Sequence, residues 1–196
     1  MNPTTNKKVV RSKKLFKKTL LSLLKEKHFE EISITEIVKE ADFNRGTFYF
    51  HYEQKEDLLE EMIDDVFTEL RKAFRHCYVS SDEEVNIIEL STIGLFDHFI
   101  KNKEFYQTML GPNITFNFQN QLIEIMKKHF REEIDFSPND KDPDINIELF
   151  YTYRVSGMIG LILEWIHNDF NHPKDYMAEQ IVKIATFYTQ KVSIKK

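Results

Sequence analysis

The segment of residues 33–55 constrains the fold of this chain more than any other stretch. Ser33 and Glu36 have the N-cap and N3 spacing of a capping box, and Ile32 and Ile37 have the N′ and N4 spacing of a hydrophobic staple. These signals agree on one helix start. An apolar stripe at helical spacing follows and then stops, so the segment predicts a short amphipathic helix that ends in a turn.

A second helix is predicted directly after this turn. Asn44 is a good N-cap residue, and we expect a helix over residues 45–51 and a third helix from about Lys55. Residues 48–52 read Phe-Tyr-Phe-His-Tyr, and a helix this short cannot bury all of these rings. The pattern is therefore that of a helix–turn–helix with an exposed aromatic surface.

Exposed rings beside basic and hydroxyl side chains suit a surface that meets a large polar partner. Duplex DNA fits, because its major groove admits one helix whose first turn can offer Asn44, Arg45 and Thr47 to base edges. Tyrosine hydroxyls, lysine ammonium groups and helix N-terminal amides would then bind phosphates. The residue types alone leave an alternative open, namely an ordinary helical corner whose rings pack on the next helix.

The same segment resembles the DNA-binding signature of the TetR family of bacterial transcriptional regulators. The matching residues are Thr35, Ile37, Ala41, Gly46, Thr47, Phe48, Tyr49, His51, Lys55 and Leu58. The segment departs from the family pattern at Asp42, where a turn glycine is usual, and at Asn44, where serine is usual. Aspartate tolerates a left-handed backbone better than most residues, and asparagine caps at least as well as serine. These departures bear on the operator sequence and not on DNA binding.

The resemblance implies an all-α chain with two domains. Residues 1–53 would form a three-helix DNA-binding domain, and residues 54–196 a helical ligand-binding and dimerisation domain. We expect a ligand-responsive repressor that binds a palindromic double-stranded DNA operator as a homodimer. The alternative is a helical small-molecule-binding or protein-interaction module with an unused helix–turn–helix.

The resemblance also assigns roles within the helix–turn–helix. Bases would be read by Arg45, Thr47 and Phe50, and phosphates would be bound by Thr35, Tyr49, His51 and Lys55. The full set of expected DNA-binding residues is Thr35, Asn44, Arg45, Gly46, Thr47, Tyr49, Phe50, His51 and Lys55.

Charge is distributed unevenly along the chain. Residues 1–52 carry a net charge of +5 and residues 53–196 one of −10, within the total of −5. Seven lysine and arginine residues, with no acid, occur in the first 18 residues, and they would extend a positive surface toward a phosphate backbone. A solubilising tail remains the other interpretation of this stretch.

The composition excludes several classes of protein. The single cysteine, Cys77, excludes an intrachain disulfide framework, and no apolar run approaches the length of a membrane span. We expect a cytoplasmic protein without membrane contact. Gly-rich phosphate loops and the Cys-x-x-Cys, His-Glu-x-x-His and Gly-x-Ser-x-Gly motifs are absent from the sequence, so no enzyme, cofactor or metal site is expected.

The rest of the chain predicts long helices. They are expected at residues 9–29, 56–78, 83–101, 105–110, 114–134, 145–170 and 175–192, with a turn at 80–82 and a loop at 136–144. The 145–170 helix is apolar nearly all round and must be covered on more than one side. The resemblance implies that the last two helices pack on their copies as a four-helix bundle, with Gly157 and Gly160 permitting a close approach. A core helix of a monomer is the alternative.

Ligand sensing is expected in the C-terminal domain. Its aromatic and methionine side chains could line a cavity for a small apolar effector, although such residues more often form the core. Arg154 stands out, because a guanidinium in an apolar helix must find an acid, a carbonyl or a ligand anion. The expected ligand-binding residues are Phe99, Tyr106, Met109, Met126, Tyr151, Arg154 and Met158.

Overall fold

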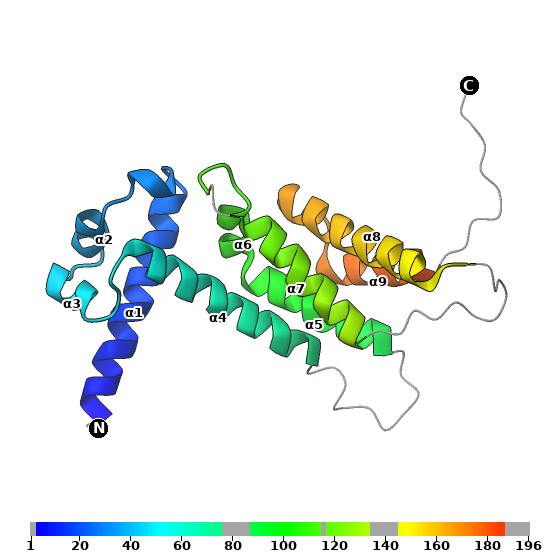
Figure 1. Ribbon diagram of the computed structural model, residues 1–196, viewed down its shortest axis with the longest axis horizontal. Coiled ribbons are helices and arrows are strands. Elements are labelled where there is room, and N and C mark those ends of the chain that lie inside the picture. The colour runs from blue at the N-terminus through cyan, green and yellow to red at the C-terminus, as the bar shows by residue number, and fades with distance from the viewer. Residues whose placement is uncertain (1–2, 76–86, 115–116, 134–144, 187–196) are drawn as a thin grey trace. The chain divides into compact units, whose positions relative to one another are not determined.

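The computed structural model describes residues 3–75, 87–114, 117–133 and 145–186, and these contain helices and connecting turns but no strand (Figure 1). In chain order the elements are α1 (Pro3–Leu24), the 3-10 helix η1 (Phe29–Glu31), α2 (Ile34–Glu40), α3 (Arg45–Tyr49), α4 (Lys55–Arg75), α5 (Ile87–Lys101), α6 (Lys103–Met109), α7 (Phe118–Glu133), α8 (Ile147–His167) and α9 (Lys174–Thr186). The predicted all-α fold is confirmed.

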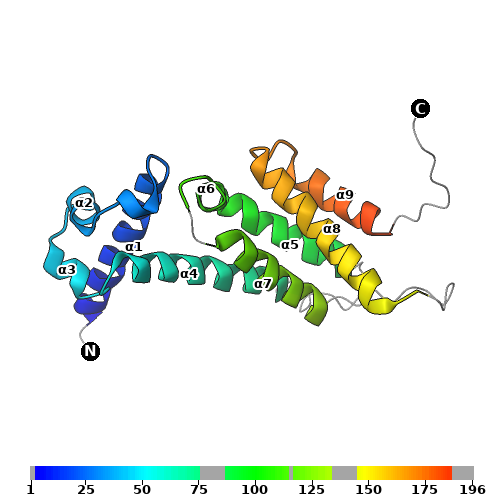
Figure 2. The ribbon, with the colours of Figure 1, turned by 45° about the horizontal axis from the view of Figure 1, so that its top comes forward.

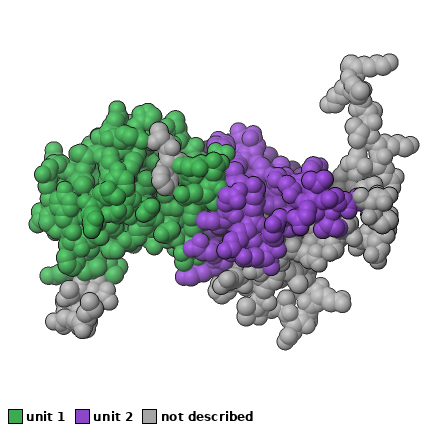
Figure 3. Space-filling model, in the orientation of Figure 1, with its two compact units in different colours: residues 1–69, 102–121 green, residues 70–101, 122–196 purple. Residues whose placement is uncertain are grey.

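The chain forms two compact units, which Figure 3 shows in different colours. The first contains residues 1–69 and 102–121, and the second contains residues 70–101 and 122–196. The helix–turn–helix therefore shares its unit with most of α4 and with α6. The predicted functional boundary between residues 53 and 54 stays a prediction.

The first unit has its core on the inner faces of α1 and α4. Phe16, Leu20 and Leu24 are buried at intervals of four residues, which places them on one face of α1. Phe48 of α3 is fully buried, and its ring centroid lies 5.4 Å from that of Phe16. α2 contacts both α1 and α3. Residues 45–52, which contain α3 and are called the recognition segment, contact α1 directly, because the Phe16 ring lies edge-to-face against both Phe48 and His51.

The second unit is organised around Trp165 of α8. Its indole is buried, and the ring of Phe96 from α5 lies 4.9 Å away between centroids. α9 lies along α5 and beside α8 in both views of the ribbon (Figures 1 and 2). One face of α8 is buried in this core through Val155, Met158, Ile159, Ile162, Leu163 and Ile166. The opposite face of the helix is not covered by the described part of the chain.

The predicted limits of the first helix are wrong at both ends. α1 begins at Pro3, a residue that suits the first helical position, and ends at Leu24 instead of Phe29. Its final turn tightens, because the amides of Lys25 and Glu26 bond to carbonyls three residues earlier. The other predicted helices are present, and the predicted ends at residues 78, 83, 134 and 192 lie outside the described residues. The predicted turn at 80–82, the loop at 136–144 and Cys77 lie outside the described residues. None of the described helices is long and apolar enough to cross a membrane.

Candidate nucleic-acid interface

The start of α2 has the predicted capping box. Ser33 is the N-cap, and its Oγ accepts a hydrogen bond from the Glu36 amide at 3.2 Å. The Glu36 carboxylate pairs with the Lys27 ammonium. This pairing, together with the nearby Ser33 backbone, holds the pKa of Glu36 below its ordinary value. The entry to the helix–turn–helix is therefore fixed by local bonds.

The turn after α2 contains a residue with a left-handed backbone. Asp42 has a φ of 57°, and the amide of Phe43 donates to the carbonyl of Val38 at 2.8 Å. A second bond runs from the Asp42 amide to the carbonyl of Lys39 at 3.2 Å. These two bonds define a Schellman motif, which closes helices with a left-handed residue. Aspartate thus fills the position where glycine is usual.

The start of α3 confirms Asn44 as the N-cap. Its Oδ1 accepts hydrogen bonds from the backbone amide of Thr47 at 2.8 Å and from the hydroxyl of Thr47 at 3.1 Å. A Cβ added to Gly46 would lie 3.3 Å from the same oxygen. Glycine at position 46 therefore leaves room for the cap, and the first turn of the recognition helix is held closely together.

The rings of the recognition segment divide between core and surface. Phe48 and Tyr52 are buried, whereas Tyr49 and Phe50 are 55% and 72% exposed. Arg45 is also exposed, and its guanidinium donates a hydrogen bond to the hydroxyl of Thr35 on α2. The structure therefore leaves a cation, hydroxyl groups and two rings exposed on α2, on α3 and on the residue that follows α3.

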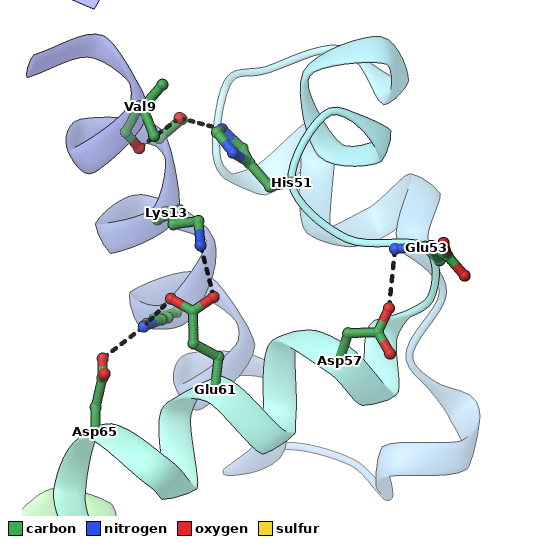
Figure 4. Close-up of polar contacts among 9 residues, drawn as sticks. Val9, Lys13, His51, Glu53, Asp57, Glu61 and Asp65 are labelled. Atoms are coloured by element: carbon green, nitrogen blue, oxygen red, sulfur yellow. Dashed lines mark hydrogen bonds and ion pairs between the residues drawn. The ribbon is translucent and has the colours of Figure 1, made fainter. Parts of the chain in front are cut away.

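His51 has an internal partner that the sequence did not indicate. Its Nε2 lies 2.7 Å from Oγ of Ser12 on α1, and that hydroxyl also lies 3.0 Å from the carbonyl of Val9 (Figure 4). The carbonyl of Lys8 lies 3.0 Å from the same hydroxyl. A serine hydroxyl has one proton, so it can donate to a carbonyl while it accepts from His51. Partial burial and the nearby Lys13 ammonium lower the pKa of the His51 imidazole.

Lys55 also has internal partners, although the sequence predicted a phosphate contact. Its Nζ lies 2.7 Å from the carbonyl of Phe29, 3.2 Å from that of Glu30 and 2.8 Å from that of Ile32. The ammonium also lies 4.6 Å from the ring centroid of Phe29. The side chain is thus turned toward the segment that leads into α2.

Two cations of the basic N-terminal stretch are paired with acids of α4. Lys13 contacts Glu61 at 2.7 Å, and Lys17 contacts Glu61 at 2.6 Å and Asp65 at 2.5 Å (Figure 4). Partial burial acts to lower the pKa of Lys17, but the carboxylates of Glu61 and Asp65 outweigh it, so the pKa is raised. These pairs fasten α1 to α4. Several other cations of the predicted basic stretch, Lys8, Arg11, Lys14 and Lys18, are exposed.

A cavity of about 700 Å³ lies between α1 and the α2–α3 turn. Lys8 and Arg11 line it together with Thr47, Phe50 and His51. The fold therefore brings basic residues of α1 next to the recognition helix, as a surface that meets a phosphate backbone requires.

The seven predicted ligand-binding residues belong to both compact units, and their role in ligand binding stays a prediction. Tyr106 and Met109 belong to the first unit and the other five to the second. Five of the seven are buried in the cores: Phe99, Tyr106, Met109, Met126 and Met158. Tyr151 lines a cavity of about 420 Å³ between α7 and α8. The guanidinium of Arg154 lies 4.9 Å from the ring centroid of Phe150. Among the described residues, no group of His, Cys, Asp and Glu could hold a metal ion.

Two family models match this chain. Residues 18–62 match the model of bacterial regulatory proteins of the tetR family, and residues 87–187 match that of a transcriptional regulator C-terminal region. An uncharacterised HTH-type transcriptional regulator of Bacillus subtilis strain 168 is 22% identical over 171 residues. The match covers 87% of this chain and 43% of that relative, so the chain spans less than half of the relative's length.

Solved structures share the fold. A TetR transcriptional regulator from Streptococcus agalactiae 2603V has a TM-score of 0.58 and 21% identity, with 93% of this chain and 97% of that chain covered. A dihydroxyacetone kinase operon activator has a TM-score of 0.58 and 19% identity, with 89% and 93% covered. Together with the helix–turn–helix geometry and the two matched regions, this places the chain in the TetR family of bacterial transcriptional regulators, which are DNA-binding proteins and not enzymes.

Proposed function

We propose that this protein is a ligand-responsive repressor that binds a palindromic DNA operator as a homodimer. The observation that carries the proposal is the division of α3 into a buried and an exposed side. Phe48 anchors the helix in the core, while Arg45 and Tyr49 extend into solvent from the same short helix, and Phe50 does so directly after it. A helix held in this way can enter the major groove with its outer side chains directed at base edges.

Each exposed side chain then has a role that fits its chemistry. Arg45 would read a guanine through its planar guanidinium, and its bond to Thr35 would orient that group. Thr47 would contact a base, and Phe50 would contact a thymine methyl. Thr35 and Tyr49 would bind phosphates through their hydroxyls. Asn44 and Gly46 would contribute by shaping the first turn of α3.

The dimer is proposed to form through α8 and α9. Leu149 and Tyr153 are 70% and 77% exposed on the uncovered face of α8. Gly157 and Gly160 continue this face, and a Cβ at either position would meet nothing within 4 Å. Tyr176 and Ile184 of α9 are also exposed. Exposed apolar side chains on two neighbouring helices, together with the glycines of α8, suit a four-helix bundle with a second copy.

Repression and ligand response are the remaining parts of the proposal. A dimer on a promoter blocks polymerase without further contacts, which favours repression. The structure described as an operon activator has the same fold, so the fold alone does not decide the sign of regulation. The cavity between α7 and α8, with Tyr151 and Val155 in its wall, has the size of a site for a small effector.

The DNA-binding proposal is tested by selecting binders from random duplexes and measuring their affinity as salt is raised. We expect a palindrome with a steep salt dependence. Arg45→Ala should cost about 1–3 kcal/mol and relax specificity at one base pair. Arg45→Lys is the matched control, because it keeps the charge and loses the planar fork, so it should retain non-specific binding. Unchanged affinity and specificity in Arg45→Ala would show that the interface is placed wrongly.

The dimer is tested by sedimentation velocity on Tyr153→Glu. A charge on the uncovered face of α8 should dissociate the dimer and with it the operator complex. Thr152→Glu is the control, since Thr152 is exposed on the same helix but lines the α7–α8 cavity. A wild-type monomer, or a Tyr153→Glu dimer as stable as the wild type, would exclude this interface.

A further inference from the structure

Lys55 is the first residue of α4, and its ammonium is fully used inside the protein. The carbonyls of Phe29, Glu30 and Ile32 lie at 2.7, 3.2 and 2.8 Å from Nζ. A lysine ammonium has three N–H donors and no acceptor. Three donors meet three carbonyls, so a phosphate could bind this group only by displacing one of them.

The location of this cation has an electrostatic cost that the carbonyls offset. A positive charge at a helix N-terminus opposes the helix dipole, and Lys55 is the first residue of α4. The carbonyls at the end of η1 carry the partial negative charge that favours a cation. The ring of Phe29, 4.6 Å from Nζ, adds a cation–π contact. The hydrogen bonds to the carbonyls and the cation–π contact therefore both hold the Lys55 side chain at η1.

These contacts join the two ends of the helix–turn–helix. Ile32 directly precedes Ser33, the N-cap of α2, whereas Lys55 directly follows the segment that leaves α3. The same first turn of α4 holds that outgoing segment, because Asp57 accepts hydrogen bonds from the amides of Glu53 at 2.9 Å and Gln54 at 3.0 Å (Figure 4). The chain that enters α2 and the chain that leaves α3 are thus fastened to one helical turn.

The entering segment is also held from its other side. The amide of Phe29 donates to the carbonyl of Asn113 at 3.1 Å, and the Asn113 side chain donates to the carbonyl of Leu24 at 2.9 Å. Because residues 29–32 are fixed between this loop and α4, a loss of the Lys55 contacts would release one side of the entry to α2 while the other side stays in place.

We propose that Lys55 is a positioning residue for DNA recognition and not a phosphate ligand. Its ammonium fixes the entry of α2 to the start of α4 and so sets the orientation of α2 and α3. This inference rests on the DNA binding proposed above. It replaces the expectation from the sequence that Lys55 binds a phosphate.

The test compares Lys55→Met, Lys55→Arg and the charge-matched control Lys72→Met, which removes an exposed lysine of α4 that has no proposed DNA contact. Affinity is measured for the selected operator and for an unrelated duplex over a range of salt concentrations. We expect Lys55→Met to weaken operator binding about tenfold or more, as the loss of hydrogen bonds to a charged group implies. Binding to the unrelated duplex and the salt slope should remain unchanged. Lys55→Arg should recover part of the operator affinity, since it keeps the charge and the donors.

A phosphate ligand would behave differently. Its loss would weaken both duplexes alike and reduce the salt slope by about 0.9. That result, or an effect of Lys55→Met no larger than that of Lys72→Met on the operator, would overturn the proposal.

A second measurement needs no DNA and separates this inference from the proposed function. Hydrogen exchange at the amides of Ile32, Glu36 and Ile37 should be faster in Lys55→Met than in wild type and in Lys72→Met, because the entry to α2 is no longer held. Unchanged exchange would overturn the positioning role. A wild-type protein that selects no duplex but shows the expected exchange would instead refute the proposed function alone.

Discussion

The turn after α2 and the turn after α8 are built alike. In each, an aspartate has a left-handed backbone, with a φ of 57° at Asp42 and 56° at Asp169. The phenylalanine next in the chain donates its amide to the carbonyl five residues earlier, at 2.8 Å after α2 and 2.9 Å after α8. Both turns are Schellman motifs, and both place that phenylalanine against another aromatic ring.

The two turns differ in how much backbone strain they contain. Phe170 also has a positive φ, of 56°, whereas Phe43 does not. A left-handed backbone costs a non-glycine residue roughly 1–2 kcal/mol. After α8 this cost is offset by the Phe170 ring, 4.7 Å from the Trp165 ring between centroids, and by the Trp165 indole, which donates to the carbonyl of His172 at 2.9 Å. After α2 the chain passes directly to the cap of α3, with one left-handed residue.

How well such a turn can be recognised from the sequence depends on the segment that follows it. The recognition turn must deliver a second helix at once, so it uses a cap residue, Asn44, close to the left-handed Asp42. The α8 turn leads into a longer connection and relies on tertiary packing against Trp165. The turn after α2 can therefore be predicted from nearby residues, whereas the turn after α8 depends on packing against the core of the second unit.

The largest expected effect is the loss of Trp165, the support of the second turn. Trp165→Ala should lower the free energy of unfolding by about 3–5 kcal/mol, as expected for a buried aromatic side chain. Urea unfolding followed by circular dichroism measures it. Phe50→Ala, at an aromatic residue that is 72% exposed, should change stability by less than about 0.5 kcal/mol. Equal effects of the two substitutions would contradict the dependence of the α8 turn on its core.

Glycine substitutions at the two phenylalanines measure the strain directly. Phe170→Gly loses a ring contact but relieves a left-handed backbone, whereas Phe43→Gly loses its contact with Phe16 and relieves nothing. Phe43→Gly should therefore cost about 1–2 kcal/mol more than Phe170→Gly in urea unfolding. The entropy gained by the unfolded chain is the same for both and cancels. The reverse order would show that Phe170 is not strained.

A smaller effect is expected at the aspartates of the turns. Asp42→Ala should cost about 1 kcal/mol, because alanine has no local side-chain bond to favour a left-handed backbone. Asp42→Gly should stay within about 0.5 kcal/mol of wild type, since relief of strain is opposed by the greater freedom of the unfolded chain. Thermal melts of both variants provide the measurement. Asp169→Ala and Asp169→Gly repeat the comparison at the second turn. If alanine were as stable as glycine at both positions, the left-handed backbone would carry no cost there.

The helix–turn–helix could be predicted from sequence because its determinants are local. The caps at Ser33 and Asn44 each bond to a residue three positions ahead, and the turn residue Asp42 lies between them. The excess apolar surface of α8 was also visible in its composition. Which of its faces is uncovered was not, because that depends on how α5 and α9 pack against it.

The partners of the polar side chains could not be predicted. Lys55 bonds to carbonyls 23 to 26 residues away, and His51 lies beside a serine 39 residues away. No helical period or motif spacing encodes such distances. One weak signal existed for Ser12, a polar residue four positions before Phe16 on the buried stripe of α1. Burial does not separate the two readings of the predicted ligand-binding residues, because aromatic side chains look alike in a core and around a cavity.

His51, which lies close to the turn between α2 and α3, is a titratable residue with a contact inside the protein. His51 lies against Ser12, and its ring centroid is 6.3 Å from that of Phe16. Partial burial, reinforced by Lys13 and opposed by Glu61, lowers the pKa of His51 in the folded protein below the value near 6.5 of a free histidine. The unfolded chain therefore takes up a proton at a higher pH than the folded chain does.

The sign of the pH dependence follows from this difference. Stability from His51 is fully present above about pH 6.5 and is lost as the pH falls toward the lower folded-state pKa, since the unfolded chain then binds more protons. Unfolding free energies of wild type and His51→Gln, measured between about pH 5 and pH 8, isolate this contribution from the other histidines. The wild type should lose more stability than His51→Gln as the pH falls. A difference that stays constant would mean that folding does not change the pKa of His51. A wild type that gains stability relative to His51→Gln on acidification would mean that the folded protein favours the imidazole as a cation at the Ser12 contact.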